Sequence, residues 1–360
     1  MNRTITFHGI FPPHSNHTLQ FCGNTTDITA FLVTSYSLET ILGVLGNTCF
    51  LSILAKQKEK AIVTNVFITN LIASGLIMCI FCLPFTIVTV LLNYWVFGEA
   101  MCRMTSFIQC TSMTVSILSL VLIALERHQL IINPMGWRPS LYQAYLGIAI
   151  IWILASLLSL PFMTNSTLSD AGFKKFYLTG SYTSKAICIS SWSSDESRLI
   201  YLTALMLLQY CLPLVFILVC YLRIYLRLRK RKCMFEKNSC RTVPLKRINV
   251  LLASMVVAFA VCWLPLHVFN SIDDWNYKIM PHCLHDLIFS LCHLIAMASA
   301  CVNPIIYGFL NSNFRKDVKT LILSCQHQSS VQEYEHLSLS TMQTDVSKDS
   351  LRLSRQQNPI

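Results

Sequence analysis

Long apolar stretches alternate with short polar segments along most of the chain. A membrane-spanning helix needs about 20 mainly apolar residues to cross the hydrocarbon core. Polar residues precede the first long stretch, so we do not expect it to be a cleaved signal peptide. The pattern predicts an all-α membrane protein, a seven-transmembrane helix bundle. The seven stretches lie at 28–55, 63–92, 104–132, 144–163, 199–226, 248–271 and 284–310.

Composition agrees with this prediction. Hydrophobic residues make up 54% of the 360 residues, and charged residues only 12%. Soluble domains carry roughly 25% charged residues, so this chain has too few of them to cover a globular surface in water. The mean hydropathy of +0.53 indicates the same class of protein.

The distribution of Lys and Arg predicts the orientation of the bundle, because cytoplasmic loops carry an excess of these residues. Basic segments are "AKQKEKA" after the first span, "RLRKRK" and "LKR" between the fifth and sixth, and "FRKDVK" after the seventh. We therefore expect a multi-pass protein of the plasma membrane with an extracellular N-terminus. The net charge of +11 is divided among these clusters, so we expect contact with anionic membrane lipid and no binding of nucleic acid.

The segments predicted to lie outside the cell carry two kinds of extracellular signal. Asn-x-Ser/Thr triplets, the acceptors of N-linked glycans, begin at Asn2, Asn16, Asn24 and Asn165. Four of the 16 cysteines also lie outside, at Cys22, Cys102, Cys188 and Cys283. The exterior is oxidising, and four cysteines allow three pairings. We favour Cys102–Cys188, between the third span and the loop before the fifth, and then Cys22–Cys283.

The third span ends in a charged triplet, Glu126, Arg127 and His128, at its predicted cytoplasmic end. A Glu beside an Arg can form an ion pair at a depth where an isolated charge is costly. The alternative is an arginine that snorkels to the lipid headgroups. Pro265 in the sixth span and Pro304 in the seventh each remove a backbone hydrogen bond and allow a bend. Two bendable helices beside an ion-paired arginine indicate a switch at the cytoplasmic face.

Short motifs recur in a fixed order: "GN" in the first span, "ERH" in the third, "CWLP" in the sixth and "NPIIY" in the seventh. This order resembles the rhodopsin-like G-protein-coupled receptors, which usually have Asp-Arg-Tyr in place of "ERH". The stretches "QKEKA", "ALERHQLIINP", "WLPLHVFNSIDDW" and "CHLIAMASACVNPIIYGFLN" and the tail "LSLSTMQTDVSKDSLRLS" resemble the neuropeptide Y receptors. Within them, the branch that prefers pancreatic polypeptide is the most similar. The resemblance covers about residues 25–360.

The resemblance implies a receptor for C-terminally amidated peptides of the pancreatic polypeptide, neuropeptide Y and peptide YY group. It also implies coupling to an inhibitory G protein, which lowers cAMP. Arg127 would meet the G-protein α-subunit, and Trp263 would lie under the ligand. Three residues of the seventh span would rearrange on activation: Asn303, Pro304 and Tyr307.

The same resemblance implies that the ligand contacts Gln109, Gln209, Asn270, Asp274 and His293. Asp274 also has a physical argument, because it lies four residues after Asn270 and therefore on the same helical face. A carboxylate at a pocket rim suits a guanidinium, which it can bind through two hydrogen bonds. The alternative is a solvated acid at a helix end. For Gln109 and His293 the alternative is a polar group satisfied within the bundle.

One position departs from the family pattern. Gly75 in the second span stands where the family has an Asp that, with a Ser and an Asn (here Ser116 and Asn303), coordinates a sodium ion. A cation in a low-dielectric interior needs a countercharge, which Gly lacks, and water can fill the space that the carboxylate leaves. We therefore expect the sodium site to be lost, and we expect no other metal and no cofactor.

The predicted chain has three regions. Residues 1–27 form an extracellular glycosylated tail, and residues 28–325 form the receptor domain. The resemblance adds a short amphipathic membrane-surface helix over 314–323 and a palmitoylation site at Cys325. Residues 326–360 are polar, without an apolar period, and should be disordered in the cytoplasm. Receptor kinases that recruit arrestin could act there on Ser338, Ser340, Thr341, Thr344, Ser347 and Ser350.

Two other classes of membrane protein fit the sequence less well. A transporter of this size should show internal repeats or broken helices at matching positions in two halves, and the sequence shows neither. An enzyme needs paired carboxylates, an activated serine or a metal cluster deep in its spans. The acids well inside, Glu39 and Glu126, lie in different spans, and "MPHCLHD" near 280–286 is more typical of a loop than of a zinc site. A receptor of the same fold for an unrelated ligand is the nearer alternative.

Overall fold

The computed structural model of the chain describes residues 25–56, 62–170, 186–234, 242–275, 282–310, 316 and 318–320. The chain divides into two compact units, Met1–Leu310 and Asn311–Ile360. The first unit contains all the predicted spans, and the second contains the segment that follows them.

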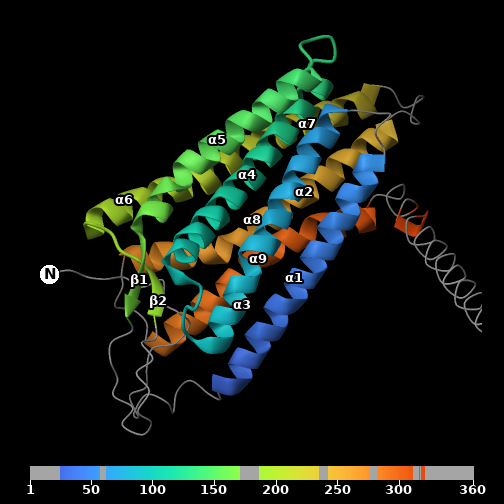
Figure 1. The fold of residues 1–360 in the computed structure, drawn as a ribbon. Helices are drawn as coiled ribbons and strands as arrows, with labels where there is room; N and C mark the ends of the chain where they lie inside the picture. Colours follow the sequence, from blue (N-terminus) through green and yellow to red (C-terminus); the bar gives the residue numbers. More distant parts are fainter. Residues whose placement is uncertain are drawn as a thin grey trace, which may run out of the picture. The chain divides into compact units, whose positions relative to one another are not determined.

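Over its described residues, the first unit is built from helices and one pair of short strands (Figure 1). The strands, β1 and β2, pair antiparallel over Ser166–Asp170 and Ala186–Ser190. Between α6 and α7 lies one π-helical turn, η1, at Leu207–Cys211. The helices are α1 (Thr25–Lys56), α2 (Val63–Phe81), α3 (Leu83–Leu92), α4 (Gly98–Ile132), α5 (Leu141–Asn165), α6 (Asp195–Met206), α7 (Leu212–Met234), α8 (Thr242–Trp275) and α9 (His282–Leu310).

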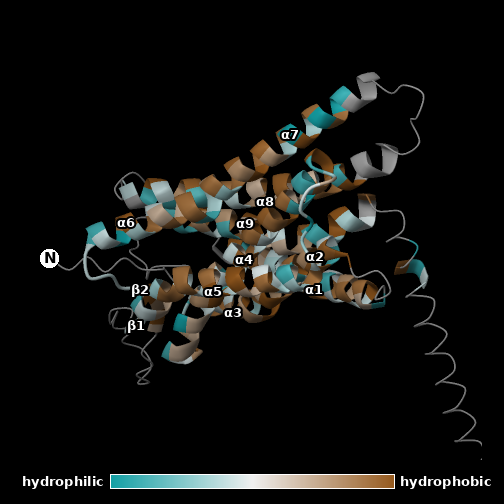
Figure 2. Ribbon diagram, turned by 90° about the horizontal axis from the view of Figure 1, so that it is seen from above, coloured by the Kyte–Doolittle hydropathy of each residue, from teal (hydrophilic) through white to brown (hydrophobic). Residues whose placement is uncertain are grey.

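Within the described ranges, seven helical segments are long and apolar enough to cross a membrane, which confirms the predicted bundle. Some of them extend beyond the predicted windows. The fifth, for example, covers Asp195–Lys230 instead of 199–226, because polar residues continue the helix past the apolar stretch. Figure 2 shows hydrophobic residues along the middle of the helices and hydrophilic residues toward the ends of α6 and α7.

Prolines explain where two of the spans are interrupted. The second span is divided into α2 and α3 at Cys82, just before Pro84 in the first turn of α3. In the fifth span the π-turn η1 ends two residues before Pro213. Because proline has no backbone N–H to donate, the hydrogen-bond ladder is interrupted there and the helix adopts a local break or a wider turn. Both irregularities lie within spans that are otherwise continuous.

Helix α4 holds the middle of the bundle together, since it packs against α2, α5 and α7. A polar cluster joins three of these helices. Asn70 of α2 donates to Ser119 Oγ of α4 at 2.8 Å and accepts a bond from Trp152 Nε1 of α5 at 2.9 Å. Because the hydrocarbon region offers no water, such polar side chains need partners within the protein. Helices α8 and α9 pack along each other, and α9 also packs against α1.

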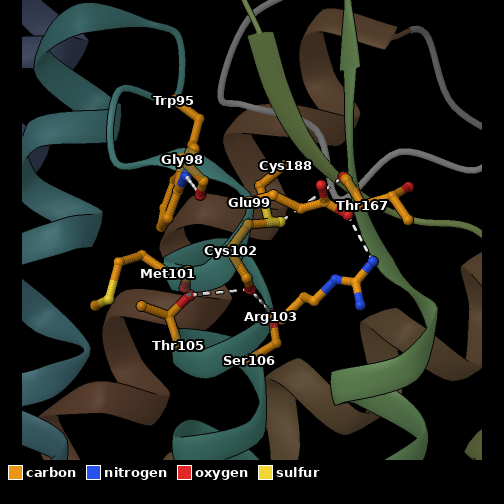
Figure 3. Close-up of a disulfide and its surroundings, with 10 residues drawn as sticks. All are labelled: Trp95, Gly98, Glu99, Met101, Cys102, Arg103, Thr105, Ser106, Thr167 and Cys188. Carbon is orange, nitrogen blue, oxygen red and sulfur yellow. Dashed lines mark hydrogen bonds and ion pairs between the residues drawn. A yellow bond between two sulfur atoms is a disulfide. The ribbon is translucent and has the colours of Figure 1, made fainter.

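The strands β1 and β2 form a hairpin at one end of the bundle, beside the start of α4 (Figure 1). A disulfide between Cys102 of α4 and Cys188 of β2 ties the two together (Figure 3). The backbone N–H of Trp95 also donates to the carbonyl of Ala186 in β2 at 2.8 Å. The favoured pairing Cys102–Cys188 is therefore confirmed.

Other predictions for the outer segments fall outside what the structure describes. Cys22 and the side chain of Cys283 lie outside the described residues, as do Asn2, Asn16 and Asn24. Asn165 is half-buried at the end of α5 and donates to the carbonyl of Pro161 at 2.8 Å. Glycosylation at these positions stays a prediction.

In the second unit, Lys316 and residues 318–320 are helical. Thr320 Oγ1 donates to the carbonyl of Lys316 at 3.0 Å, a contact between successive helical turns. The remainder of the predicted surface helix at 314–323, Cys325 and the tail at 326–360 lie outside the described residues. The amphipathic helix and the palmitoylation site therefore stay predictions.

Candidate functional site

A chain of hydrogen bonds joins three helices in the half of the bundle that carries the hairpin. Gln109 of α4 lies with its Nε2 3.2 Å from His293 Nε2 of α9. The other ring nitrogen of His293, Nδ1, lies 2.9 Å from Tyr36 Oη of α1. Tyr36 also donates to the carbonyl of Ser290 at 3.2 Å. The structure thus brings together two of the predicted ligand residues, Gln109 and His293, and adds Tyr36, which the sequence analysis missed.

The donors and acceptors of this chain fit one protonation pattern. Because the hydroxyl of Tyr36 gives its only proton to Ser290, it must accept a bond from His293 Nδ1–H. His293 Nε2 then carries a lone pair, which accepts from the amide of Gln109. Tyr36 and His293 are both buried, so this pattern satisfies polar groups that have little access to solvent.

Gln209 lies on the π-turn η1 and faces α4. Its Nε2 donates to Thr114 Oγ1 at 2.7 Å and to Cys110 Sγ at 3.3 Å. The wider π-turn changes the direction of the side chains that follow it, and the side chain of Gln209 is buried. Gln109, which belongs to α4, and Gln209, which bonds to α4, therefore both lie in the half of the bundle that carries the hairpin.

Trp263 of α8 lies buried among aromatic side chains. Its Nε1 donates to Ser299 Oγ of α9 at 3.0 Å, and its ring lies 6.0 Å from Phe259 and 6.1 Å from His267, measured between centroids. The indole therefore links α8 to α9 at one point of their contact. Pro265 follows two residues later inside α8.

The C-terminal end of α8 carries the remaining two predicted ligand residues. The side chain of Asn270 is exposed, so the structure does not bring it into the buried network of Gln109 and His293. Asp274 lies on the last turn of α8, and its side chain lies outside the described residues.

At the opposite end of α4, Thr64 of α2 bridges the predicted ion pair. Its hydroxyl lies 2.6 Å from both carboxylate oxygens of Glu126 and accepts from Arg127 Nη2 at 2.5 Å. The direct contact is looser, with Arg127 Nε 3.7 Å from Glu126 Oε2. Both charges are largely buried, so the hydroxyl supplies the closer of the two links between them. His128, the third residue of the triplet, is half-buried.

Thr64 is a candidate functional residue that the sequence analysis missed. Its position at the start of the second span, at the predicted cytoplasmic end, is a usable signal, because it places the hydroxyl near the level of Glu126. The sequence does not show which helix faces which, so it could not select Thr64 over other hydroxyl residues at that level.

Two of the predicted switch residues of the seventh span, Pro304 and Tyr307, lie against α1. Tyr307 is buried, and its ring lies 4.5 Å from that of Phe50 between centroids. Pro304 approaches Gly46 of α1 so closely that a Cβ there would lie 3.0 Å from the proline ring. Glycine at 46 therefore allows α1 and α9 to pack at the proline. Asn303 is half-buried.

Gly75 lies buried on α2 opposite α9. A Cβ added at Gly75 would lie 3.5 Å from the carbonyl oxygen of Ala300, an ordinary van der Waals distance. Beside it, the hydroxyls of Ser74 and Ser116 lie 2.8 Å apart, and Ser116 donates to the carbonyl of Ser112 at 2.9 Å. Ser116 is therefore already engaged within the protein.

Comparison with known proteins gives the class first. The family model of the 7 transmembrane receptor (rhodopsin family) matches residues 46–307. The chain is 55% identical to human neuropeptide Y receptor type 4-2 over 95% of the chain and 92% of that protein. It is 55% identical to mouse neuropeptide Y receptor type 4 over 94% and 91%, and 49% identical to the type 1 receptor of Xenopus laevis over 91% and 90%.

The chain therefore belongs to the neuropeptide Y receptors of the rhodopsin family. It is a multi-pass membrane protein and a peptide receptor that acts with a G protein, and not an enzyme. These comparisons confirm the predicted fold class and the resemblance drawn from the motifs.

The contacts of Thr64 lead to a first prediction. Thr64→Val keeps the size of the side chain but removes the hydroxyl that bridges Glu126 and Arg127. Hydrogen bonds to charged groups contribute about 1.5–3 kcal/mol, so we expect a freer arginine and a basal rate of G-protein nucleotide exchange raised by roughly tenfold, since about 1.4 kcal/mol corresponds to that factor. Exchange on purified G protein without ligand measures this rate.

Thr69→Val on the same helix is the matched control. The hydroxyl of Thr69 is exposed and bonds only the backbone carbonyl of Asn65. Equal basal rates for the two variants would contradict a bridging role for Thr64.

Proposed function

We propose that the chain is a cell-surface receptor for C-terminally amidated peptides of the pancreatic polypeptide, neuropeptide Y and peptide YY group. It couples to an inhibitory G protein and lowers cAMP. The observation that carries the proposal is the polar chain from Gln109 through His293 to Tyr36 in the half of the bundle beneath the hairpin, in a member of the neuropeptide Y receptors.

The ligand site combines a polar interior with an acidic rim. Gln109 and His293 offer an amide and a ring nitrogen from α4 and α9, and Gln209 faces the same part of α4. The C-terminal amide of a peptide can exchange hydrogen bonds with these groups. Asp274, on the last turn of α8, supplies a carboxylate for a ligand arginine, and Asn270 adds a polar contact one turn away.

Transmission to the cytoplasmic face runs through the residues between the two ends. A ligand above Trp263 shifts α8 against α9, and Pro265 and Pro304 let these helices bend. The cluster around Arg127 then opens to admit the G protein. The Gln109 and Arg127 ends of α4 lie 18 residues apart, or roughly 27 Å at 1.5 Å per residue, which is consistent with a ligand on one side of the membrane and a G protein on the other.

The remaining parts of the proposal concern the surroundings of the bundle. The protein lies in the plasma membrane with its N-terminus outside, and glycans are attached at Asn2, Asn16, Asn24 and Asn165. Cys22–Cys283 forms a second disulfide, and palmitate on Cys325 anchors the segment after α9 to lipid. Receptor kinases phosphorylate the tail, which then binds arrestin.

Titration with the three peptides tests the proposed function. Cells that express the chain should lower forskolin-stimulated cAMP in response to pancreatic polypeptide, peptide YY or neuropeptide Y, and the rank order identifies the preferred ligand. Pertussis toxin should abolish the response, because it uncouples inhibitory G proteins. A response that survives the toxin would exclude the proposed coupling, and no response to any peptide would exclude the proposed ligand class.

The charge of the peptide gives a further prediction. If Asp274 binds a ligand arginine, Asp274→Ala should weaken binding by about 2–5 kcal/mol, since a buried cation is left without its partner. Asp273 pairs with His285 at 2.9 Å instead, so Asp273→Asn should cost much less at one fixed pH. Radioligand competition compares the two variants. Equal losses, or no loss at Asp274, would refute the assignment.

The glycine at position 75 leads to a prediction of how sodium affects agonist affinity. Without a carboxylate, and with Ser116 already bonded to Ser74, we expect agonist affinity to be nearly independent of sodium. Gly75→Asp should restore a loss of affinity in sodium, while Gly75→Asn, equal in size but uncharged, should not. Binding in sodium and in an organic cation at matched ionic strength measures this effect. A strong sodium effect on the unaltered chain would show that the site does not need the carboxylate.

A further inference from the structure

An imidazole lies between two carboxylates where the outer ends of α8 and α9 meet. His285 Nε2 lies 2.9 Å from Asp273 Oδ1 on α8, and His285 Nδ1 lies 3.2 Å from Asp286 Oδ1 on α9. The side chains of His285, Asp273 and Asp286 are 22%, 17% and 6% exposed. These three residues, which we call the acid–histidine clamp, form no part of the ligand network around Gln109.

The proton count of the clamp is unusual. A neutral imidazole carries one N–H, and a carboxylate only accepts hydrogen bonds. With both ring nitrogens at hydrogen-bond distance from carboxylate oxygens, a neutral His285 would turn one lone pair toward an anion. One additional proton removes this conflict, because the imidazolium donates to Asp273 and Asp286 at once. With this proton on the ring, both of its nitrogens are donors and each carboxylate only accepts.

The surroundings of the clamp favour keeping this proton. Asp286 is buried, and its Oδ2 has no hydrogen-bond partner among the residues that the structure describes. The ring of Phe269 lies 5.0 Å from the imidazole and limits access to water. Among the described residues, the other charged groups at the outer ends of helices packed against α8 and α9 are Asp27 of α1, the ion pair of Glu99 and Arg103 of α4, and Asp195, Glu196 and Arg198 of α6. The side chains of Asp274, Lys278 and His282 lie outside the described residues.

Aromatic side chains connect the clamp to the ligand network. Phe269 lies 5.0 Å from His285 and 5.9 Å from Phe289, measured between ring centroids. Phe289 in turn stacks on His293 at 5.9 Å. Asp273 also directly precedes Asp274 on the last turn of α8. The clamp therefore lies one residue from Asp274 along the chain and is linked through Phe269 to the ring beside the buried histidine.

We propose that His285 is a positioning residue that holds the outer ends of α8 and α9 together only when its ring is protonated. Loss of this proton turns a lone pair toward one carboxylate and releases that contact. The sign follows from linkage: the clamped state binds a proton that the open state releases, so clamping weakens as pH rises. The effect on ligand affinity rests on the proposed function, whereas the effect on stability does not.

Asp273→Asn tests the proton count directly. The new amide can donate to His285 Nε2 while Nδ1–H donates to Asp286, so a neutral ring satisfies both contacts. For the purified full-length receptor, the midpoint of thermal unfolding should fall by about 2–4 °C between pH 5.5 and 8 in the unchanged chain, and by much less in Asp273→Asn. His285→Gln, which removes the titrating group, should also flatten the profile even if it lowers stability throughout.

Binding of pancreatic polypeptide provides the second readout. Its affinity for the unchanged chain should fall on the order of fivefold from pH 6 to 8, while Asp273→Asn should bind nearly equally at both pH values. The same peptide is used with the unchanged chain, Asp273→Asn and His285→Gln. Any protonation of the peptide itself therefore affects all three affinities equally. If no peptide binds but the thermal profiles differ as expected, the proposed function fails and the clamp stands.

Two results would overturn the clamp. One is a thermal profile of the unchanged chain that does not change between pH 5.5 and 8. The other is a profile of Asp273→Asn as steep as that of the unchanged chain. A merely structural contact would lower stability by the same amount at every pH and leave the slope unaltered.

Discussion

The bundle depends on one constraint: polar groups inside the hydrocarbon must find their partners within the protein, because water is absent there. Some buried polar side chains therefore fix the contact between particular helices. Asn70 bonds Ser119 and Trp152 and so positions α2, α4 and α5. Gln209 does the same for η1 and α4. An apolar pair could slide or rotate with little change in free energy, but a hydrogen bond at 2.7–2.9 Å permits one arrangement.

Helix α4 is one rigid element that carries a candidate site near each of its two ends. Toward the hairpin, Gln109 joins it to α9 through His293; toward the other end, Glu126 and Arg127 join it to α2 through Thr64. The disulfide of Cys102 holds the hairpin against the first turns of the same helix. Changes at one end can therefore reach the other through helices that pack on α4, while α4 itself provides a fixed reference.

Both ends use a similar arrangement, in which a third group mediates between groups that could otherwise pair directly. Thr64 stands between a carboxylate and a guanidinium, and His285 stands between two carboxylates. Each mediator serves two partners: loss of the Thr64 hydroxyl removes both of its links, and loss of the proton on His285 releases one of its two carboxylates. At Gly75, in the middle of the bundle, the chain has no charged side chain that could join α2 to α4. The hydroxyls of Ser74 and Ser116 bond each other there instead. The inner and outer clusters are thus separated by a neutral layer on α2 and α4.

The sequence by itself determined the spans, the class of receptor and most of the candidate residues. Span length and hydrophobicity are properties of continuous segments, and the order of "GN", "ERH", "CWLP" and "NPIIY" identified the family. Only the tertiary structure revealed Thr64, Tyr36 and the pairing of Asp273 with His285, since these contacts join positions whose helix faces the sequence does not orient. It likewise supplied the hairpin of β1 and β2 and the π-turn at Gln209, which arise from the disulfide, from Pro213 and from packing against α4. Local patterns determine what forms a helix in a membrane, whereas the choice of neighbour depends on hydrogen bonds between distant parts of the chain.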